Sequence, residues 1–269
     1  MTNIYILEKI VRNAGKIMLG VDGVDADGDI CAKSGDANYV TVFDVKVQNY
    51  LIGEIKKVFP DAVFLAEEQD NDPSVLQGDH CFIIDPIDGT TNFIRNYKQS
   101  SISVAMFSGG KAVLGIVYNP YLDELFSATE GNGAFLNGER IFVSEKSLSE
   151  AVIGFGSSPY YKEELGRKTF DSLFSIFMRC ADVRRTGSAA IDLANVAAGR
   201  IDGFFEMRLS PWDIAAGYIL IKEAGGVITD LYGKDMDLSA QSSVVAGSLK
   251  VHGALLSCLK QHRNRWSWL

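Results

Sequence analysis

Apolar residues along the chain recur at two spacings, which predict an alternation of helices and strands. Leu7, Ile10, Val11 and Ala14 lie three or four positions apart, the spacing of one face of a helix. Helices are predicted in this way over residues 2–20, 41–59, 161–180, 189–199 and 251–259. A further helix follows Ser210, since a serine N-cap, a proline at the first helical position and an acid three residues after the cap form a helix-start signal.

Shorter apolar runs, bounded by glycine, asparagine and proline, predict strands. The runs at 101–107, 111–118, 124–128 and 134–135 are separated by turn residues and predict an antiparallel meander. Other strands are predicted at 62–66, 182–185, 202–206, 227–229 and 244–246. Residues 22–38, which are rich in glycine and aspartate, are predicted to form a loop or short hairpin with Lys33 near its tip.

Composition bounds the class of protein. With 269 residues, 47% of them apolar, the chain can bury a sizeable core. We divide the chain into two halves, residues 1–146 and 147–269, which are expected to form one integrated catalytic unit. A net charge of -8 argues against non-specific binding to nucleic acid or anionic lipid. The apolar runs are too short for a membrane helix and no signal-peptide pattern is present, so a cytoplasmic location is expected. The scattered cysteines and histidines suggest no zinc site, disulfide framework or nucleophilic triad.

The distinctive chemistry lies in the segment from Phe82 to Phe93. An apolar run ends in Asp85 and Asp88, with Pro86 between them favouring extended geometry at the end of a strand. A Gly-Thr-Thr turn follows directly, and its free N–H groups could seat a phosphate if a helix begins there. Two acids beside an anion seat are typical of a metal site. Oxygen ligands without a nearby histidine or cysteine favour a hard cation, Mg²⁺ first.

Three further acids are candidates for the same site. Glu67 follows the strand at 62–66, and Asp44 lies in the first turns of its helix. Asp213 opens a helix with almost no polar face before Lys222, so that helix is predicted to be buried between layers. A buried carboxylate needs a partner. A cation shared by several carboxylates would be a partner for all of them.

The two blocks Asp85–Phe93 and Trp212–Gly217, with Glu67 and Glu68 upstream, make the sequence resemble the inositol monophosphatases. These belong to a superfamily of Mg²⁺-dependent, lithium-sensitive phosphatases, and the resemblance runs through almost the whole chain. It implies an α/β fold with five layers, α-β-α-β-α, a homodimer, and hydrolysis of a phosphate monoester such as myo-inositol 1-phosphate. It also implies two to three Mg²⁺ ions, with Mn²⁺ as a substitute and Li⁺ and Ca²⁺ as inhibitors.

The resemblance further implies roles for individual residues. One Mg²⁺ would be held by Glu67, Asp85 and the Ile87 carbonyl, and a second by Asp85, Asp88 and Asp213. Glu67 would help hold a weaker third ion near Lys33. The catalytic residues would be Thr90, Asp44 and Glu67, of which Thr90 and Asp44 position a metal-bound water. The substrate-binding residues would be Asp88, Gly89, Thr90, Gly187, Ser188, Ala189, Glu206 and Asp213.

The chemistry agrees with this set. The transition state of phosphoryl transfer needs charge neutralisation more than covalent help. Two metal ions, about 3.5–4 Å apart, can bind the attacking and the leaving oxygen. A bridging Asp85 would fix their separation.

Two alternatives remain open. The substrate is alternatively fructose 1,6-bisphosphate or another sugar or nucleotide phosphate, since the catalytic half is shared within the superfamily. Ala66 and Ser210-Pro211 depart from residues found in many members without removing a metal ligand. The second alternative is a protein-interaction role in a transcription complex, which some bacterial relatives resemble. Arg184 and Arg185 are the local feature that could be connected with such a role.

Overall fold

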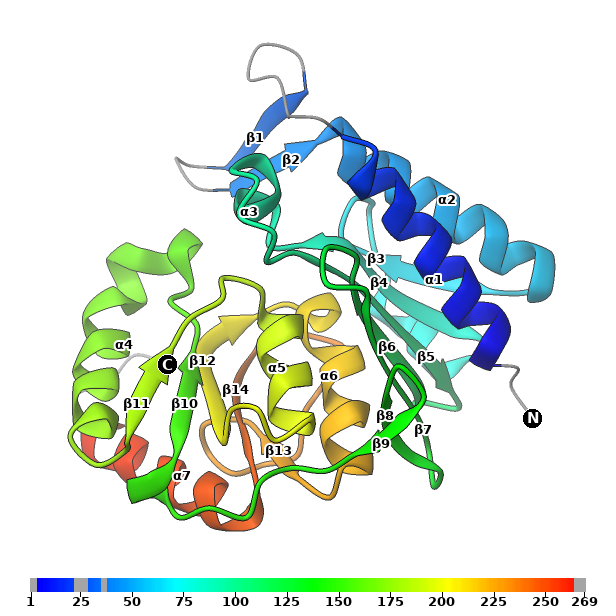
Figure 1. The fold of residues 1–269 in the computed structure, drawn as a ribbon. Coiled ribbons are helices and arrows are strands. Elements are labelled where there is room, and N and C mark those ends of the chain that lie inside the picture. Colours follow the sequence, from blue (N-terminus) through cyan, green and yellow to red (C-terminus); the bar gives the residue numbers. More distant parts are fainter. Residues whose placement is uncertain (1–3, 22–28, 35–37, 264–269) are drawn as a thin grey trace.

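The computed structural model describes residues 4–21, 29–34 and 38–263, and these form five alternating layers (Figure 1). In order, the layers are the helices α1 (Ile4–Leu19) and α2 (Val42–Val58), a seven-stranded sheet, the helices α5 (Ala189–Ala197) and α6 (Pro211–Glu223), a five-stranded sheet, and the helices α4 (Lys162–Phe177) and α7 (Leu249–Arg263). The predicted α-β-α-β-α sandwich is therefore confirmed. Within the described residues, no helix is both long and apolar enough to cross a membrane.

The seven-stranded sheet contains the predicted meander. Its strands lie in sequence order: β3 (Val63–Ala66), β4 (Cys81–Asp88), β5 (Ser101–Ser108), β6 (Lys111–Asn119), β7 (Glu124–Thr129), β8 (Gly133–Leu136) and β9 (Glu139–Ile141). All neighbours are antiparallel except β3 and β4, which run parallel. The parallel pair places the ends of β3 and β4, with the acids that follow or close them, at the same edge of the sheet.

The five-stranded sheet is mixed. Its order is β11 (Asp182–Arg184), β10 (Val152–Phe155), β12 (Gly203–Leu209), β14 (Ser242–Gly247) and β13 (Val227–Thr229). The strand β10 runs parallel to both of its neighbours, and the other pairs are antiparallel. The remaining elements are a hairpin of β1 (Ile30–Ser34) and β2 (Asn38–Thr41), the short helix α3 (Thr90–Ile94), and the 3-10 turns η1 (Pro73–Gln77), η2 (Leu148–Glu150) and η3 (Pro159–Tyr161).

The segment predicted as a loop or hairpin at 22–38 is described only in part. Residues 22–28 and 35–37 lie outside the described residues, while the rest contributes to the β1–β2 hairpin. Lys33 belongs to β1, but its side chain is not among those described. Its role beside a third ion therefore stays a prediction.

Both faces of the seven-stranded sheet are buried, and the alternation along β4 decides which side each residue faces. Phe82 and Ile84 pack with the apolar side chains of α1 and α2, whereas Cys81 and Ile83 pack with those of α5 and α6. Because side chains alternate along a strand, Asp85 continues the Cys81–Ile83 face. The first acid of the motif therefore points toward the layer that carries Asp213.

The helix α6 is the central packing element, and it is apolar around most of its circumference. Its side chains Ile214, Ala216, Ile219 and Leu220 belong to one core with residues of both sheets. The helix approaches the first sheet closely at Gly115 of β6, where an added Cβ would lie 2.7 Å from the Ala216 carbonyl oxygen. Small residues at the contact thus hold α6, and the acid in its first turn, close to β4 and β6.

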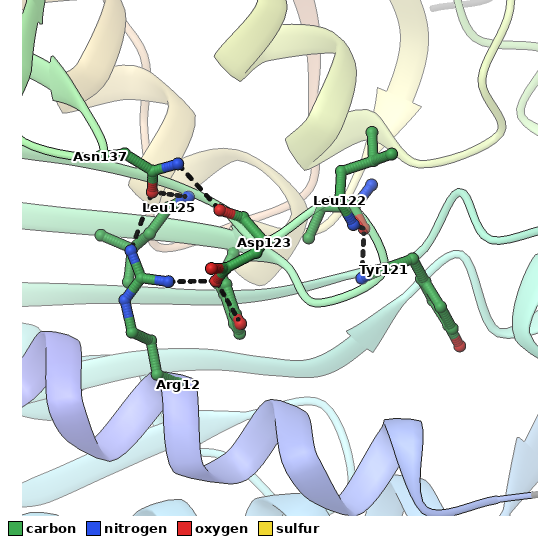
Figure 2. A network of polar contacts seen from close by, with 8 residues as sticks. Arg12, Tyr121, Leu122, Asp123, Leu125 and Asn137 are labelled. Atoms are coloured by element: carbon green, nitrogen blue, oxygen red, sulfur yellow. Dashed lines mark hydrogen bonds and ion pairs between the residues drawn. The ribbon is translucent and has the colours of Figure 1, made fainter.

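A polar network fastens α1 to the turn between β6 and β7 (Figure 2). The Arg12 guanidinium donates to Asp123 and to Asn137 Oδ1, the latter over 2.8 Å. Asn137 in turn donates to the Asp123 carbonyl over 2.8 Å and accepts from the Leu125 N–H over 3.0 Å. The outer helix layer is therefore anchored to the sheet by directed bonds as well as by apolar packing.

The close approach of α6 to β6 gives a test with a matched pair of glycine substitutions. We expect Gly115→Ala to destabilise the protein by about 1–3 kcal/mol or more, because a Cβ there meets Ile219 at 2.4 Å as well as the Ala216 backbone. Gly53→Ala, in the exposed interior of α2 with no atom within 4 Å of the added Cβ, should stabilise it by about 1 kcal/mol. Urea denaturation measures the free energy of unfolding of both variants. Equal changes in the two variants would contradict the close packing of α6 against β6.

Candidate active site

A cavity of about 670 Å³ opens where the first sheet, α5, α6 and the second sheet meet. It is lined by nearly all of the residues that the sequence predicted for the site, namely Glu67, Asp85, Ile87, Asp88, Gly89, Thr90, Gly187, Ser188, Ala189, Glu206 and Asp213. The fold therefore collects residues from both halves of the chain in one place. Asp44 is the exception, because it is fully buried behind Thr90 and does not line the cavity.

Three carboxylates form the floor of this cavity. Asp85, Asp88 and Asp213 each offer an oxygen atom, and these atoms all lie within 4.8 Å of one another. Asp85 and Asp88 are buried. Glu67 follows β3 at the same edge of the sheet, where its N–H donates to the Ile84 carbonyl over 3.1 Å. Oxygen atoms this close together on several acids are the donor set of a hard divalent cation.

The local backbone explains how two acids of one strand reach the same floor. The register between β4 and β5 shifts between Asp85 and Asp88, so the strand is bulged at Pro86. The Ile87 N–H donates to Asp85 Oδ1 over 3.0 Å, which fixes that side chain. Gly89 then adopts φ 86°, a left-handed conformation that favours glycine, and α3 begins at Thr90, which meets the condition set for a phosphate site at this turn.

Each of the other two acids is held by a helix N-terminus. Asp88 Oδ2 accepts hydrogen bonds from Ser188 Oγ and, over 2.8 Å, from the Ala190 N–H at the start of α5. Asp213 Oδ2 accepts from the Ser210 N–H over 2.7 Å, as the predicted helix-start signal requires. Helix N-termini stabilise negative charge. The carboxylates are therefore oriented by the helices even though they repel one another.

Burial and mutual repulsion change the protonation of these acids. Burial, followed by the charges of Glu67 and Asp88, raises the pKa of Asp85 well above its usual value. Burial and the charges of Asp88 and Glu67 do the same to the pKa of Asp213. Burial raises the pKa of Asp88 to about 6, although its bonds to Ser188 and Ala190 oppose the shift. A divalent cation would remove this repulsion, so the residues present fit the metal that the sequence predicted.

Thr90 and Asp44 form a second, separate unit. Thr90 Oγ1 lies 3.3 Å from Asp44 Oδ1 and 3.2 Å from the Ile87 carbonyl oxygen. Asp44 Oδ2 accepts from the Thr41 N–H over 2.7 Å and from the Thr41 hydroxyl over 2.5 Å, which caps α2. Asp44 is thus both the helix-capping residue and the acceptor for Thr90. Its place in the capping box of α2 is therefore compatible with the catalytic role that the resemblance implies.

The wall contributed by the second sheet is built around Glu206 of β12. Its Oε1 accepts from the Ser158 N–H over 2.8 Å and from the Ser158 hydroxyl over 3.2 Å. Burial raises the pKa of Glu206 to about 7. A Cβ at Gly156 would lie 1.7 Å from Glu206 Oε2, so only glycine leaves room for this carboxylate. The cavity wall therefore depends on Gly156 and Ser158 as well.

Several cavity residues were not predicted as site residues. They are Gly156, Ser158, Tyr160 and Asp192, together with Arg95, Arg185 and Arg208 on the same lining. For Asp192 a signal was present, because a single acid interrupts the apolar stretch from Ala189 to Ala198. For the others no local pattern distinguishes them from surface or loop residues, since their place depends on how the second sheet packs.

The five-layer fold and a cavity whose floor is a cluster of acids that could hold a metal ion define the class of protein, and comparison with known proteins specifies it. The model of the inositol monophosphatase family matches residues 2–264. The chain belongs to this family, as its motifs predicted. Membership implies a phosphatase.

Relatives over most of the chain have three kinds of name. An inositol-1-monophosphatase of Mesorhizobium japonicum is 40% identical over 84% of this chain and 85% of its own. A fructose-1,6-bisphosphatase/inositol-1-monophosphatase of Thermotoga maritima is 38% identical, covering 94% of each chain. Nus factor SuhB of Escherichia coli is 36% identical over 97% of this chain and 96% of its own. Family and fold are thus shared by proteins described in different terms.

Among solved structures, an inositol monophosphatase (IMPase) of Thermotoga maritima superposes with a TM-score of 0.88. It is 37% identical in sequence, and the alignment covers 98% of this chain and 99% of the other. The five-layer architecture is therefore that of the family.

The raised pKa values predict a link between pH, metal and stability. The folded protein binds more protons at Asp85, Asp88 and Asp213 than the unfolded chain does, so in EDTA its stability should fall as the pH rises from about 4 through 6 and above. Mg²⁺, if it is the ion of this site, would bind the ionised carboxylates of the folded state. We expect it to raise the melting temperature more at pH 8 than at pH 5. Differential scanning fluorimetry with EDTA or Mg²⁺ measures this, and parallel pH profiles in both would contradict it.

Proposed function

We propose that this chain is a Mg²⁺-dependent phosphatase whose substrate is myo-inositol 1-phosphate. The observation that carries the proposal is the juxtaposition of the Asp85, Asp88 and Asp213 oxygens with a threonine that is bound to a buried acid. Glu67, Asp85, the Ile87 carbonyl, Asp88 and Asp213 would hold two ions, and Glu67 would contribute to a weaker third. Bound divalent cations supply charge neutralisation for the phosphoryl group and make water more acidic.

The chain's own residues then orient the reactants. Because Asp44 and the Ile87 carbonyl lie within reach of the Thr90 hydroxyl proton, the Thr90 oxygen is left to accept a hydrogen bond from the attacking water. The N–H groups of Gly89 and Thr90, at the turn before α3, would bind the phosphate. The wall formed by Glu206 and the backbone of Gly187, Ser188 and Ala189 would contact the hydroxyls of the alcohol, beside Asp88 and Asp213.

The direct test of this proposal removes one carboxylate of the floor without changing its shape. Asp88→Asn should abolish phosphate release from inositol 1-phosphate, because it removes one negative charge from the proposed cation ligands. In EDTA the melting temperature should not fall below that of the unchanged protein, since the amide oxygen can still accept from Ala190 and one repelling charge is removed. Asp171→Asn, which alters an exposed ion pair with Arg167, is the matched control. Turnover retained by Asp88→Asn would refute the metal assignment.

A substrate panel decides the second part of the proposal. Steady-state rates with Mg²⁺ on inositol 1-phosphate, fructose 1,6-bisphosphate and adenosine 3′,5′-bisphosphate, each with and without Li⁺, separate the alternatives. We expect the highest kcat/KM for inositol 1-phosphate and inhibition by Li⁺. A clear preference for fructose 1,6-bisphosphate would show that the proposed substrate is wrong but would leave the proposed phosphatase reaction in place. The Thermotoga maritima relative has both activities in its name.

We also infer that the protein acts as a homodimer. The helix α4 exposes Phe170, Phe174 and Phe177, with Met178 directly after it, and Phe174 is 65% exposed. An apolar stripe of this kind on one helix face is typical of an interface. Sedimentation velocity at micromolar concentration should give twice the chain mass, and Phe174→Ser should shift it toward the single chain. A wild-type protein that sediments as a monomer would count against the dimer.

The interaction role weighed for Arg184 and Arg185 finds no support in their surroundings. Arg184 forms an ion pair with Asp182, whereas Arg185 lines the cavity and lowers the pKa of Glu206. The two arginines thus do not share one surface feature. We make no proposal of this second class for the chain.

A further inference from the structure

Asp192 lies in the cavity wall. It belongs to α5, three residues after Ala189, and so on the same face of that helix. Its side chain lines the cavity together with Asp88 and Glu206, yet the residue is only 2% exposed. An acid this deep in the protein needs partners for its oxygen atoms.

Among the described residues, Thr186 is a hydrogen-bond partner of Asp192, but the set of partners is incomplete. Asp192 Oδ1 is buried and has no hydrogen-bond partner among the residues that the structure describes. Other buried acids of the cavity differ in this respect. Glu206 accepts two bonds from Ser158, and Asp88 accepts bonds from Ser188 and Ala190. The carboxyl of Asp192 is therefore a polar group in a binding cavity with unused bonding capacity.

The charge around Asp192 favours its neutral form. Burial raises the pKa of Asp192 to about 8, and the negative charges of Glu206 and Asp88 act in the same direction against the lowering effect of Thr186. A neutral carboxyl group carries one O–H donor and retains an acceptor oxygen. It can thus both donate to and accept from a hydroxyl group, which an ionised carboxylate cannot do.

We propose that Asp192 is a specificity-determining residue whose carboxyl group hydrogen-bonds a hydroxyl of the substrate's alcohol portion. The ligand class is a phosphate monoester of a polyhydroxylated alcohol, with its phosphate toward Asp85 and Thr90 and a hydroxyl toward Asp192. This inference rests on the proposed function. It adds a residue of α5 to the hydroxyl-binding wall, beside Glu206 of β12.

A buried acid outside the cavity provides a matched control. Asp202 is also buried, on the same half of the chain, but it does not line the cavity. Its Oδ2 accepts from the Val152 N–H over 2.6 Å, and its Oδ1 lies 3.7 Å from Lys146 Nζ. Replacing Asp202 by alanine therefore removes the contacts of a buried acid at a position that cannot contact a substrate in the cavity.

The experiment compares a polyol substrate with one that has no hydroxyl. Steady-state kinetics with Mg²⁺ are measured for Asp192→Ala, Asp192→Asn and Asp202→Ala on inositol 1-phosphate and on p-nitrophenyl phosphate. We expect Asp192→Ala to lower kcat/KM for inositol 1-phosphate about 10-fold, mostly through KM, and to leave p-nitrophenyl phosphate within about twofold. Asp192→Asn, whose amide can also donate and accept, should stay within about threefold on both.

The control variant should behave differently. Asp202→Ala should lower the melting temperature and change both substrates by the same factor. An equal loss on both substrates in Asp192→Ala would assign Asp192 a merely structural role and overturn the proposal. So would the absence of any loss, or an Asp192→Asn variant as impaired as Asp192→Ala.

A separate binding measurement keeps this inference apart from the proposed function. If the unchanged protein hydrolyses neither substrate, the proposed phosphatase activity fails. Calorimetric titration with myo-inositol in the presence of Mg²⁺ and phosphate then decides the role of Asp192. About 10-fold weaker binding by Asp192→Ala supports it, whereas equal affinity, or no binding to the unchanged protein, overturns it.

Discussion

The repulsion among buried carboxylates is the constraint on which the structure depends. Carboxylate oxygens of Asp85, Asp88 and Asp213 lie within 4.8 Å of one another on the cavity floor, where burial and like charges disfavour ionisation. The fold offsets part of this cost locally, because the N-termini of α5 and α6 donate to Asp88 and Asp213. A bound cation would offset the remainder. The repulsion within the floor and its proposed capacity to hold metal are thus two aspects of one arrangement.

The same constraint explains the position of α6. A carboxylate from the second half reaches the first sheet only if its helix lies directly against β4, β5 and β6, and this requires small residues such as Gly115 and Ala216 at the contact. The apolar character of α6 on nearly all sides fits a helix packed between two sheets. The site is therefore completed by layer packing, so that core stability and the geometry of the floor cannot be separated.

Under the proposed function, residues in and behind the cavity would form a reacting side and a recognising side. Thr90, Asp44 and the acids of β4 belong to the first sheet and its helices, whereas Glu206, Ser158 and Asp192 come from the second sheet and α5. Relatives with different names share the fold over nearly their whole length. A division of this kind allows the chemistry to stay constant while a few residues on the opposite wall change the alcohol that is accepted.

Signals that lie within a few residues of sequence were sufficient to predict several elements. The capping residues of α6, the turn at Gly89 and the meander of the first sheet were predictable, because each depends on neighbours a few residues away. The bulge at Pro86 was not predicted. The family motifs further indicated the acids of the floor and the five layers. Other features emerge only from the folded chain: Gly156 leaves room for Glu206, and Asp192 has an oxygen without a hydrogen-bond partner among the described residues. These features arise from contacts between segments far apart in the chain, for which spacing and propensity contain no information.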